Sequence, residues 1–198
     1  MNSIFTAAAP VERAASEPQA APAAPSAAET GAGPDARPML HAATAVATPD
    51  GPRAVETLAP GDRVVLRGGE AMALDDVRRV VLQRPDWAYA PAIWPIRVPV
   101  GALGNAVPLR LSPGMRVRLP REGGFATVAH LTGIGGIARD RPLAAIRYFE
   151  LVLPDHALVD VEGAFCESAP VGTRVVDAPL SRDDARAAFA RAVGRPAA

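Results

Sequence analysis

The chain has 198 residues, of which 49% are hydrophobic, and its 21 basic and 21 acidic side chains leave no net charge. This length suffices for one domain of ordinary size with tails, and a neutral chain lacks the electrostatic footprint expected of nucleic-acid or anionic-membrane binding. Its single cysteine, Cys166, excludes an intramolecular disulfide and any cysteine-based zinc cluster.

Residues 1–37 are predicted to form a disordered leader. From Ala7 to about Pro38 the chain is almost entirely Ala, Pro, Glu, Ser and Gly, a composition that buries too little apolar surface to offset the entropy of ordering. The first six residues lack a basic segment and a long apolar run, so they encode neither a signal peptide nor a transmembrane helix. A cytoplasmic location is the default expectation, while secretion without such a signal and docking of the leader on an unknown protein partner stay open.

Residues 38–172 are predicted to form one domain of short strands separated by turns. Pro49-Asp50-Gly51 and Pro60-Gly61-Asp62 are turn signatures beside β-branched segments. Strands are expected at residues 44–48, 63–66, 77–83, 94–100, 115–119, 127–131, 146–153 and 157–161. The spacing typical of a parallel α/β sheet does not occur, so the pattern favours an all-β, antiparallel domain.

Residues 173–198 are predicted to be a linker followed by one short helix. Ser181 is a favourable N-cap, Asp183 lies in the first turn where the helix dipole favours negative charge, and Gly194 is a stop signal. The residues on one face are Ala185, Ala188, Phe189, Ala192 and Val193. Because this stripe is mostly alanine, docking through Phe189 and loose attachment stay equally open.

Several short segments occur in a characteristic order along the predicted domain. They are Ala47-Thr48-Pro49, Leu58-Ala59-Pro60-Gly61-Asp62-Arg63-Val64, Pro95-Ile96-Arg97-Val98, Gly101-Ala102-Leu103-Gly104-Asn105, Leu111-Ser112-Pro113-Gly114-Met115-Arg116-Val117, Tyr148-Phe149-Glu150-Leu151 and Asp155-His156. In this order they resemble a bacterial Hint (Hedgehog/intein) domain, over approximately residues 39–171. The resemblance implies a Hint-like fold, in which antiparallel β structure curves and closes on itself.

The resemblance also implies a self-cleavage chemistry whose central residues are replaced in this chain. In the family a Cys opens the domain and attacks the preceding carbonyl, and the histidine of a Ser/Thr-Pro-x-His segment activates that amide bond. The matching positions here are Met39 and Met115, whereas Ser112 and Pro113 are kept. A thioether has no ionisable proton for the acyl shift, and methionine lacks both ring nitrogens of histidine. We therefore expect the family's autoprocessing to be lost.

Near the end of the domain the resemblance implies an imidazole that helps to resolve the intermediate. His156 fits that position, while Glu150 stands where related bacterial sequences often have histidine. Taken alone, His156 is better explained as a residue that caps a hairpin turn beside Asp155. Intein splicing further requires an Asn at the far end of the domain, and the asparagines of this chain, Asn2 and Asn105, lie elsewhere.

Structural roles explain the other candidate residues better than chemical ones. Thr44 lies inside an expected strand, where packing is the favoured role. Cys166 follows the last expected strand and has no basic neighbour in the sequence, so a small buried hydrophobe is favoured over a reactive thiol. His41, His130, His156 and Cys166 have spacings that match no metal-binding motif. We therefore expect no metal site and no cofactor.

The sequence thus favours a non-catalytic Hint-like domain that is retained as a structural or interaction module. Its vestigial site positions are Met39, Ser112, Met115 and His156, none of which is expected to be active. One alternative is an autoprocessing domain that still cleaves through an unorthodox nucleophile, Ser112 or Thr44. Another is a protein that binds a small ligand in the former catalytic cleft.

Overall fold

The computed structural model describes residues 36–121, 123–169 and 178–194. Within these ranges the chain is mostly antiparallel β structure with few helices, which confirms the predicted fold class. Nearly all of the predicted leader, and most of the predicted linker, lie outside the described residues. No helix in the described ranges is long and apolar enough to cross a membrane.

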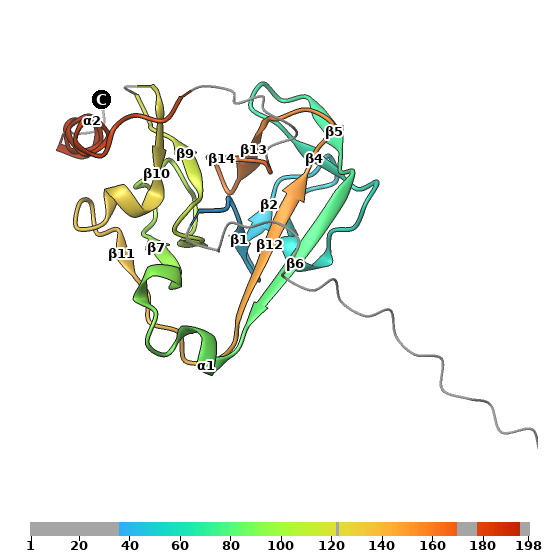
Figure 1. The fold of residues 1–198 in the computed structure, drawn as a ribbon. Helices are drawn as coiled ribbons and strands as arrows, with labels where there is room; N and C mark the ends of the chain where they lie inside the picture. Colours follow the sequence, from blue (N-terminus) through green and yellow to red (C-terminus); the bar gives the residue numbers. More distant parts are fainter. Residues whose placement is uncertain (1–35, 122, 170–177, 195–198) are drawn as a thin grey trace, which may run out of the picture.

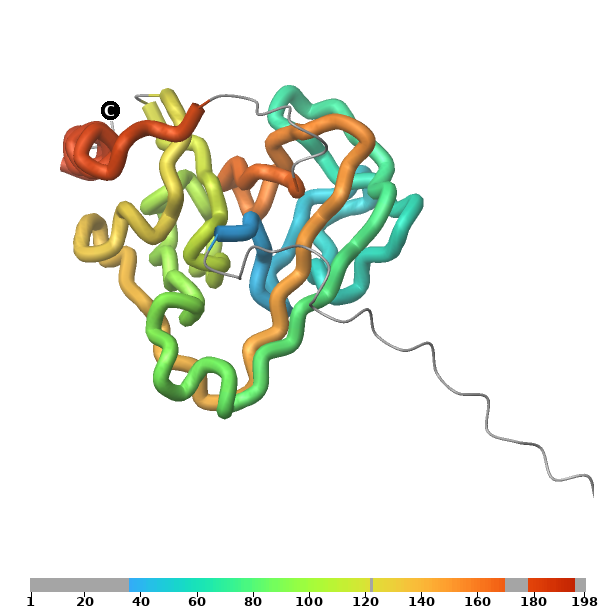
Figure 2. Tube along the Cα trace, viewed as in Figure 1, coloured from blue at the N-terminus to red at the C-terminus, as the bar shows by residue number. Residues whose placement is uncertain are grey.

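The largest sheet has six strands in the order β11-β7-β8-β1-β12-β6, and every neighbouring pair is antiparallel. Its strands are β1 (Leu40–His41), β6 (Asp76–Leu82), β7 (Ile96–Val98), β8 (Leu109–Leu111), β11 (Ala138–Arg139) and β12 (Ile146–Val152). The long strands β6 and β12 run side by side along one side of the molecule (Figures 1 and 2). The short strand β1 lies between β8 and β12, which places the start of the domain in the middle of the sheet.

A second sheet has four strands in the order β10-β9-β14-β13, and two small ribbons complete the β structure. The four strands are β9 (Arg116–Arg118), β10 (Phe125–Thr127), β13 (Leu158–Val161) and β14 (Ala164–Glu167). The ribbons pair β2 (Ala45–Val46) with β3 (Arg53–Ala54) and β4 (Arg63–Val65) with β5 (Ala71–Ala73), and the 3-10 turn η1 (Val55–Thr57) follows β3. The predicted turns at residues 49–51 and 60–62 therefore precede β3 and β4.

The segment Gly101-Ala102-Leu103-Gly104-Asn105 has a structural role in joining the two larger sheets. Asn105 is 1% exposed, and its side-chain amide donates to the carbonyl oxygens of Pro99 (3.0 Å) and Val107 (2.6 Å). The turn between β13 and β14 packs against this segment so closely that a Cβ on Gly163 would lie 2.9 Å from the Gly104 carbonyl oxygen. Glycine is therefore required at position 163, where the backbone φ is also positive.

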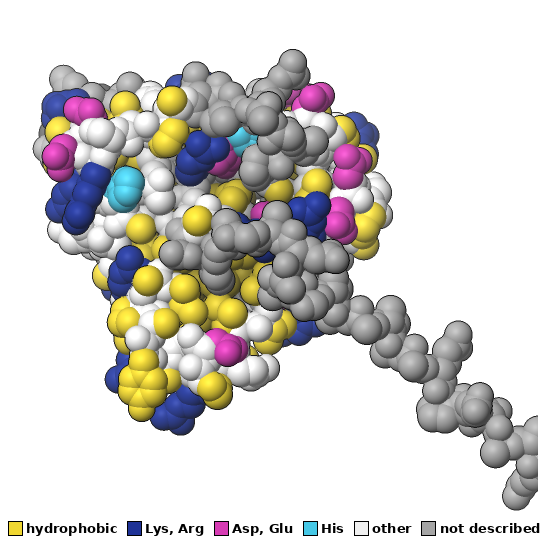
Figure 3. All heavy atoms as spheres, in the orientation of Figure 1, with side chains coloured by type: hydrophobic (Ala, Val, Ile, Leu, Met, Phe, Trp, Pro, Cys, Tyr) yellow, Lys and Arg dark blue, Asp and Glu magenta, His cyan; other side chains and the backbone are white. Residues whose placement is uncertain are grey.

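Two hydrophobic clusters form the interior. The main cluster takes side chains from both larger sheets, including Leu40, Leu111, Met115, Phe149, Val159 and Cys166. The smaller cluster contains Met39, Val80, Trp87, Ile146 and Tyr148. It lies where the helix α1 (Arg84–Trp87) supplies Trp87 and the 3-10 turn η2 (Pro91–Ile93) packs Ile93 against it. Hydrophobic side chains also gather on the surface at this end of the molecule (Figure 3), where α1 lies in the same view (Figure 1).

The predicted carboxyl-terminal helix is α2 (Arg182–Gly194), and it docks on the β structure. The Ser181 hydroxyl caps its first turn by accepting the Asp184 backbone N–H (3.2 Å). Phe189 is fully buried, and the Arg186 guanidinium donates to the carbonyl oxygens of His130 (2.9 Å) and Thr132 (2.8 Å). Of the two arrangements that the sequence leaves open, the structure therefore has the docked one.

The expected strand at residues 127–131 is wrong. Strand β10 ends at Thr127, which pairs with Arg116 at the start of β9, so no further β9 residue is available as a partner. Residues Val128–Leu131 form the 3-10 turn η3 instead. Because Val128 and Leu131 are three residues apart, this turn directs both side chains to the same, buried side. The apolar spacing of a strand and that of a 3-10 turn are too similar to separate in so short a segment.

The expected position of Cys166, after the last core strand, is also wrong. Cys166 lies within β14, opposite Val159 of β13 and Val117 of β9. Strand β14 follows directly on the tight turn at Glu162-Gly163, so β13 and β14 form a hairpin that the sequence analysis did not recognise. The burial of Cys166, which is 1% exposed, agrees with the predicted role of a small hydrophobe.

Candidate functional site

Ser112 holds the peptide bond that precedes Met39. It follows β8, whose Leu111 pairs with Leu40 of β1, and this register brings Ser112 beside the start of the domain. The Ser112 Oγ accepts a hydrogen bond from the Met39 N–H (2.9 Å) and donates one to the Arg37 carbonyl oxygen (2.7 Å). The Ser112 N–H in turn donates to the Met39 carbonyl oxygen (2.9 Å). Three hydrogen bonds thus fix the backbone on both sides of the Pro38–Met39 bond.

The two methionines are buried close to this backbone but on different sides of it. Met39 is 0% exposed and belongs to the smaller cluster with Trp87 and Tyr148. Met115 is 1% exposed and belongs to the main cluster. A tight turn, in which the Met115 N–H donates to the Ser112 carbonyl oxygen (3.0 Å), sets its position. The structure therefore brings the three predicted positions together, since the backbones of Met39 and Met115 are both hydrogen-bonded to Ser112.

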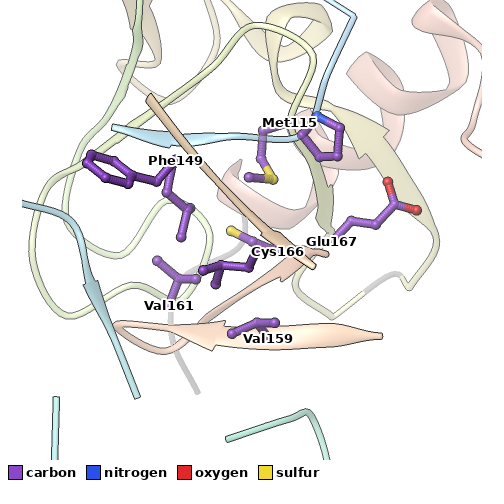
Figure 4. A pocket seen from close by; sticks show the side chains of 9 residues that line it. Met115, Phe149, Val159, Val161, Cys166 and Glu167 are labelled. Atoms are coloured by element: carbon purple, nitrogen blue, oxygen red, sulfur yellow. The ribbon is translucent and has the colours of Figure 1, made fainter. Parts of the chain in front are cut away.

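A small cavity lies beside Met115. Its lining consists of Pro38, Leu40, Met115, Phe149, Leu151, Val159, Val161, Cys166 and Glu167, and it has about 10 Å³ of space for a water-sized molecule. That volume is at the lower limit for a single water. The sulfur atoms of Met115 and Cys166 turn toward the same space, whereas the Glu167 carboxylate points away from it (Figure 4). Burial raises the pKa of the Cys166 thiol to about 12, so this side chain stays protonated at neutral pH.

His156 lies in a buried polar cluster. Its Nε2 is 2.7 Å from Oε1 of Glu167, and Glu167 is also paired with Arg116 of β9 through two hydrogen bonds. The expected hairpin turn at His156 is wrong, because β12 belongs to the six-stranded sheet and β13 to the four-stranded sheet. His156 thus sits on the connection between the sheets, and Glu167 links it to the wall of the cavity.

The sequence analysis missed an ion pair at the same site. The Arg37 guanidinium binds the Glu150 carboxylate through two donors, one of them Nε at 3.3 Å from Oε1. Glu150 lies on β12 and its side chain is 4% exposed. One signal could have revealed the pair: Glu150 is a lone charge in the apolar run Tyr148-Phe149-Glu150-Leu151-Val152, and a buried carboxylate requires a cationic or hydrogen-bonding partner.

With this geometry described, the chain can be compared with known proteins. Its sequence matches the Hint domain family over residues 38–173, which is more than half of its length. The chain belongs to the Hint domain family. A comparison with curated proteins finds no match.

Solved inteins resemble this Hint domain in fold. A crystal structure of the MchDnaB-1 intein has 16% sequence identity and a TM-score of 0.43, covering 65% of this chain and 98% of the intein. A variant of the same intein has 17% identity and a TM-score of 0.44, covering 66% and 98%. A splice-inactive variant of the AceL NrdHF class 3 split intein has 14% identity and a TM-score of 0.40, covering 67% and 99%. At these identities the likeness concerns the fold alone.

Thr44 and His41 have structural partners in this Hint domain. The Thr44 hydroxyl donates to the Arg110 carbonyl oxygen (3.4 Å). His41 packs edge-on against Tyr148, with ring centroids 6.1 Å apart, and its Nδ1 is 2.8 Å from the Ala42 carbonyl oxygen. Burial lowers the His41 pKa below 6.5. Within the described ranges, no three His, Cys, Asp or Glu side chains come together as a metal site would require.

Proposed function

We propose that this Hint domain is non-catalytic and serves as a structural or interaction module. The observation that carries the proposal is the environment of the Met39 amide. Ser112 still holds that amide at 2.9 Å, while thioether side chains occupy positions 39 and 115. A backbone held in place without a thiol and an imidazole has binding geometry but lacks the thiol nucleophile and the imidazole proton donor on which the family's chemistry depends.

Intact-mass measurement of the purified full-length chain tests this proposal. The mass is expected to stay unchanged over days at neutral pH, with or without added thiol. Thiols intercept thioesters, so an active Hint domain would release its upstream segment faster in their presence. A fragment that begins at Met39 or Thr44 would overturn the proposal.

Ser112 is the alternative nucleophile that lies beside the upstream backbone, since its Oγ donates to the Arg37 carbonyl oxygen (2.7 Å), but it would have to turn from this oxygen to attack a carbonyl carbon. If a fragment forms in the wild type and disappears in Ser112→Ala, cleavage depends on this hydroxyl, either as the nucleophile or as the group that holds the Met39 amide. Thr44→Ala is the matched control, since the Thr44 hydroxyl is engaged with the Arg110 carbonyl oxygen instead.

Binding of a small ligand in the former catalytic cleft has less support. The cavity beside Met115 has about 10 Å³ of space for a water-sized molecule, whereas sites for small molecules usually have roughly 300 to 1,000 Å³. A ligand would therefore have to displace part of the lining, and Pro38 is the lining residue nearest to the start of the domain.

A further inference from the structure

The carboxylate of Glu150 is occupied by a side chain from the chain's own upstream segment. Arg37 contributes two donors to it, and the exposed fractions of the two side chains are 14% for Arg37 and 4% for Glu150. Arg78 also approaches Glu150, with its Nη1 3.6 Å from Oε2. Its side chain is 48% exposed, however, and its Nε lies 3.4 Å from Oδ2 of Asp76. Arg37 is therefore the main buried counter-charge of Glu150.

The geometry of this pair is that of a guanidinium site. Arginine presents a planar fork of donors that matches the two oxygens of a carboxylate, and paired hydrogen bonds of this kind give direction as well as attraction. Strand β12 fixes Glu150, because its backbone pairs with Arg78 of β6. The carboxylate is thus held ready at a defined place, and a guanidinium that reaches it removes the cost of a buried charge.

The residues beside Arg37 have contacts of their own. The proline ring of Pro38 lines the cavity with Met115. Ser112 binds the Arg37 carbonyl oxygen and the Met39 N–H at 2.7 Å and 2.9 Å. Side chain, ring and backbone of one short segment are therefore recognised by three different elements of the domain.

We infer that Glu150, Ser112 and the cavity beside Met115 together form a binding site for an arginine-proline peptide segment, and that its resident occupant is the chain's own Arg37-Pro38. Glu150 binds the guanidinium, Ser112 binds the backbone and the cavity receives the proline. The segment acts as a strap that fixes the point at which the upstream chain leaves the domain. This inference goes beyond a non-catalytic role, since it holds whether or not the domain cleaves itself.

Hydrogen exchange of the Met39 amide in the full-length protein tests the strap. Arg37→Ala and Glu150→Gln are each expected to speed this exchange about tenfold or more, because they release the segment that Ser112 holds. Arg78→Ala is the matched control and is expected to change it less than about threefold, since its guanidinium is half exposed. Unchanged exchange in Arg37→Ala would overturn the inference.

Chemical rescue identifies the site directly. Millimolar ethylguanidinium is expected to raise the melting temperature of Arg37→Ala toward the wild-type value, because it fills the vacated place on Glu150 and neutralises a buried charge. The Met39 exchange should stay fast, since the free ion is not joined to the chain. The same compound should have no effect in Glu150→Gln, and ethylammonium should rescue Arg37→Ala less well because it lacks the planar fork. Failure of rescue in Arg37→Ala, or equal rescue in the Arg37→Ala/Glu150→Gln double variant, would overturn the assignment. If Glu150→Gln does not fold, the comparison of ethylguanidinium with ethylammonium on Arg37→Ala still decides between the outcomes.

Discussion

The backbones of Met39 and Met115 are both hydrogen-bonded to Ser112, yet their side chains lie in different hydrophobic clusters. The Met39 side chain packs with Trp87 and Tyr148, and that of Met115 packs beside Cys166. The two methionines therefore fill two separate parts of the interior, and Ser112 joins their backbones through its hydroxyl and its carbonyl oxygen.

Ser112→Ala is expected to lower the free energy of unfolding by about 1 to 3 kcal/mol, because the buried Met39 N–H loses its acceptor. Denaturant melts measure this change. Thr57→Ala is the control, since its exposed hydroxyl donates to Ala54 (2.8 Å), and it should cost less than about 0.5 kcal/mol. Equal costs for the two variants would mean that the Ser112 hydrogen bonds do not contribute to stability.

Met115→His is expected to lower the free energy of unfolding by about 1 to 2 kcal/mol, because an imidazole would be buried with few polar partners. Equilibrium denaturation of the variant tests this. Met72→His, at a half-buried position on β5, is the matched control and should cost less. A rise in stability, or no change together with a normally titrating imidazole, would show that position 115 is accessible to water.

Met39→Cys tests the separation of the two clusters. If Met39 lay at the fraying start of the domain, this substitution would lower the free energy of unfolding only slightly. The Met39 side chain is fully buried, however, with 0% exposed. We expect a loss of about 1 to 3 kcal/mol from the contacts that the shorter side chain leaves unfilled. In the double variant with Met115→His, the two costs should add to within about 0.5 kcal/mol. A larger departure from additivity would mean that the two positions are coupled, either through their shared partner Ser112 or through direct contact of the side chains.

Phe189→Ala is expected to release α2 from the β structure, because it removes the largest fully buried side chain of the helix. The loss of docking free energy should be about 3 to 5 kcal/mol. Hydrogen exchange would show α2 amides losing protection while those of β12 keep theirs. Arg182→Ala, at an exposed position of the same helix, should leave both unchanged. If α2 stays protected in Phe189→Ala, the Arg186 hydrogen bonds and the buried alanines of the helix suffice to hold it.

His41 should make the stability of the domain depend on pH. Burial lowers its pKa below 6.5 in the folded chain, so the unfolded chain takes up the proton first as the pH falls. The associated stability is present above pH 6.5 and decreases as the pH falls toward the folded pKa. Between about pH 7.5 and 5.5, melts of the wild type should lose more stability than those of His41→Gln. If the free energy of unfolding changed with pH by the same amount in both proteins, this prediction would be contradicted.

Strong local patterns predicted much of the fold. The long apolar run at residues 146–153 is β12, and the helix signals around Ser181 and Gly194 mark α2. Short elements such as β1 and η3 were missed or wrongly assigned, since two to four residues carry too little periodicity and their state depends on a distant partner. For the same reason the candidate site was predicted as positions in the chain, while the Arg37–Glu150 pair became visible only when β1 and β12 were placed together.

The central position of β1 has a consequence for how the chain folds. The Met39–Ser112 hydrogen bond joins residues 73 positions apart, and the Arg37–Glu150 pair joins residues 113 positions apart. Contacts of such high sequence separation slow folding, because a long loop must close before they form. On the ribosome, the first strand of the domain to be synthesised has to wait for β8 as its first partner and for β12, which is among the last strands, as its second. The central place of β1 in the sheet is therefore completed only when most of the domain has been made.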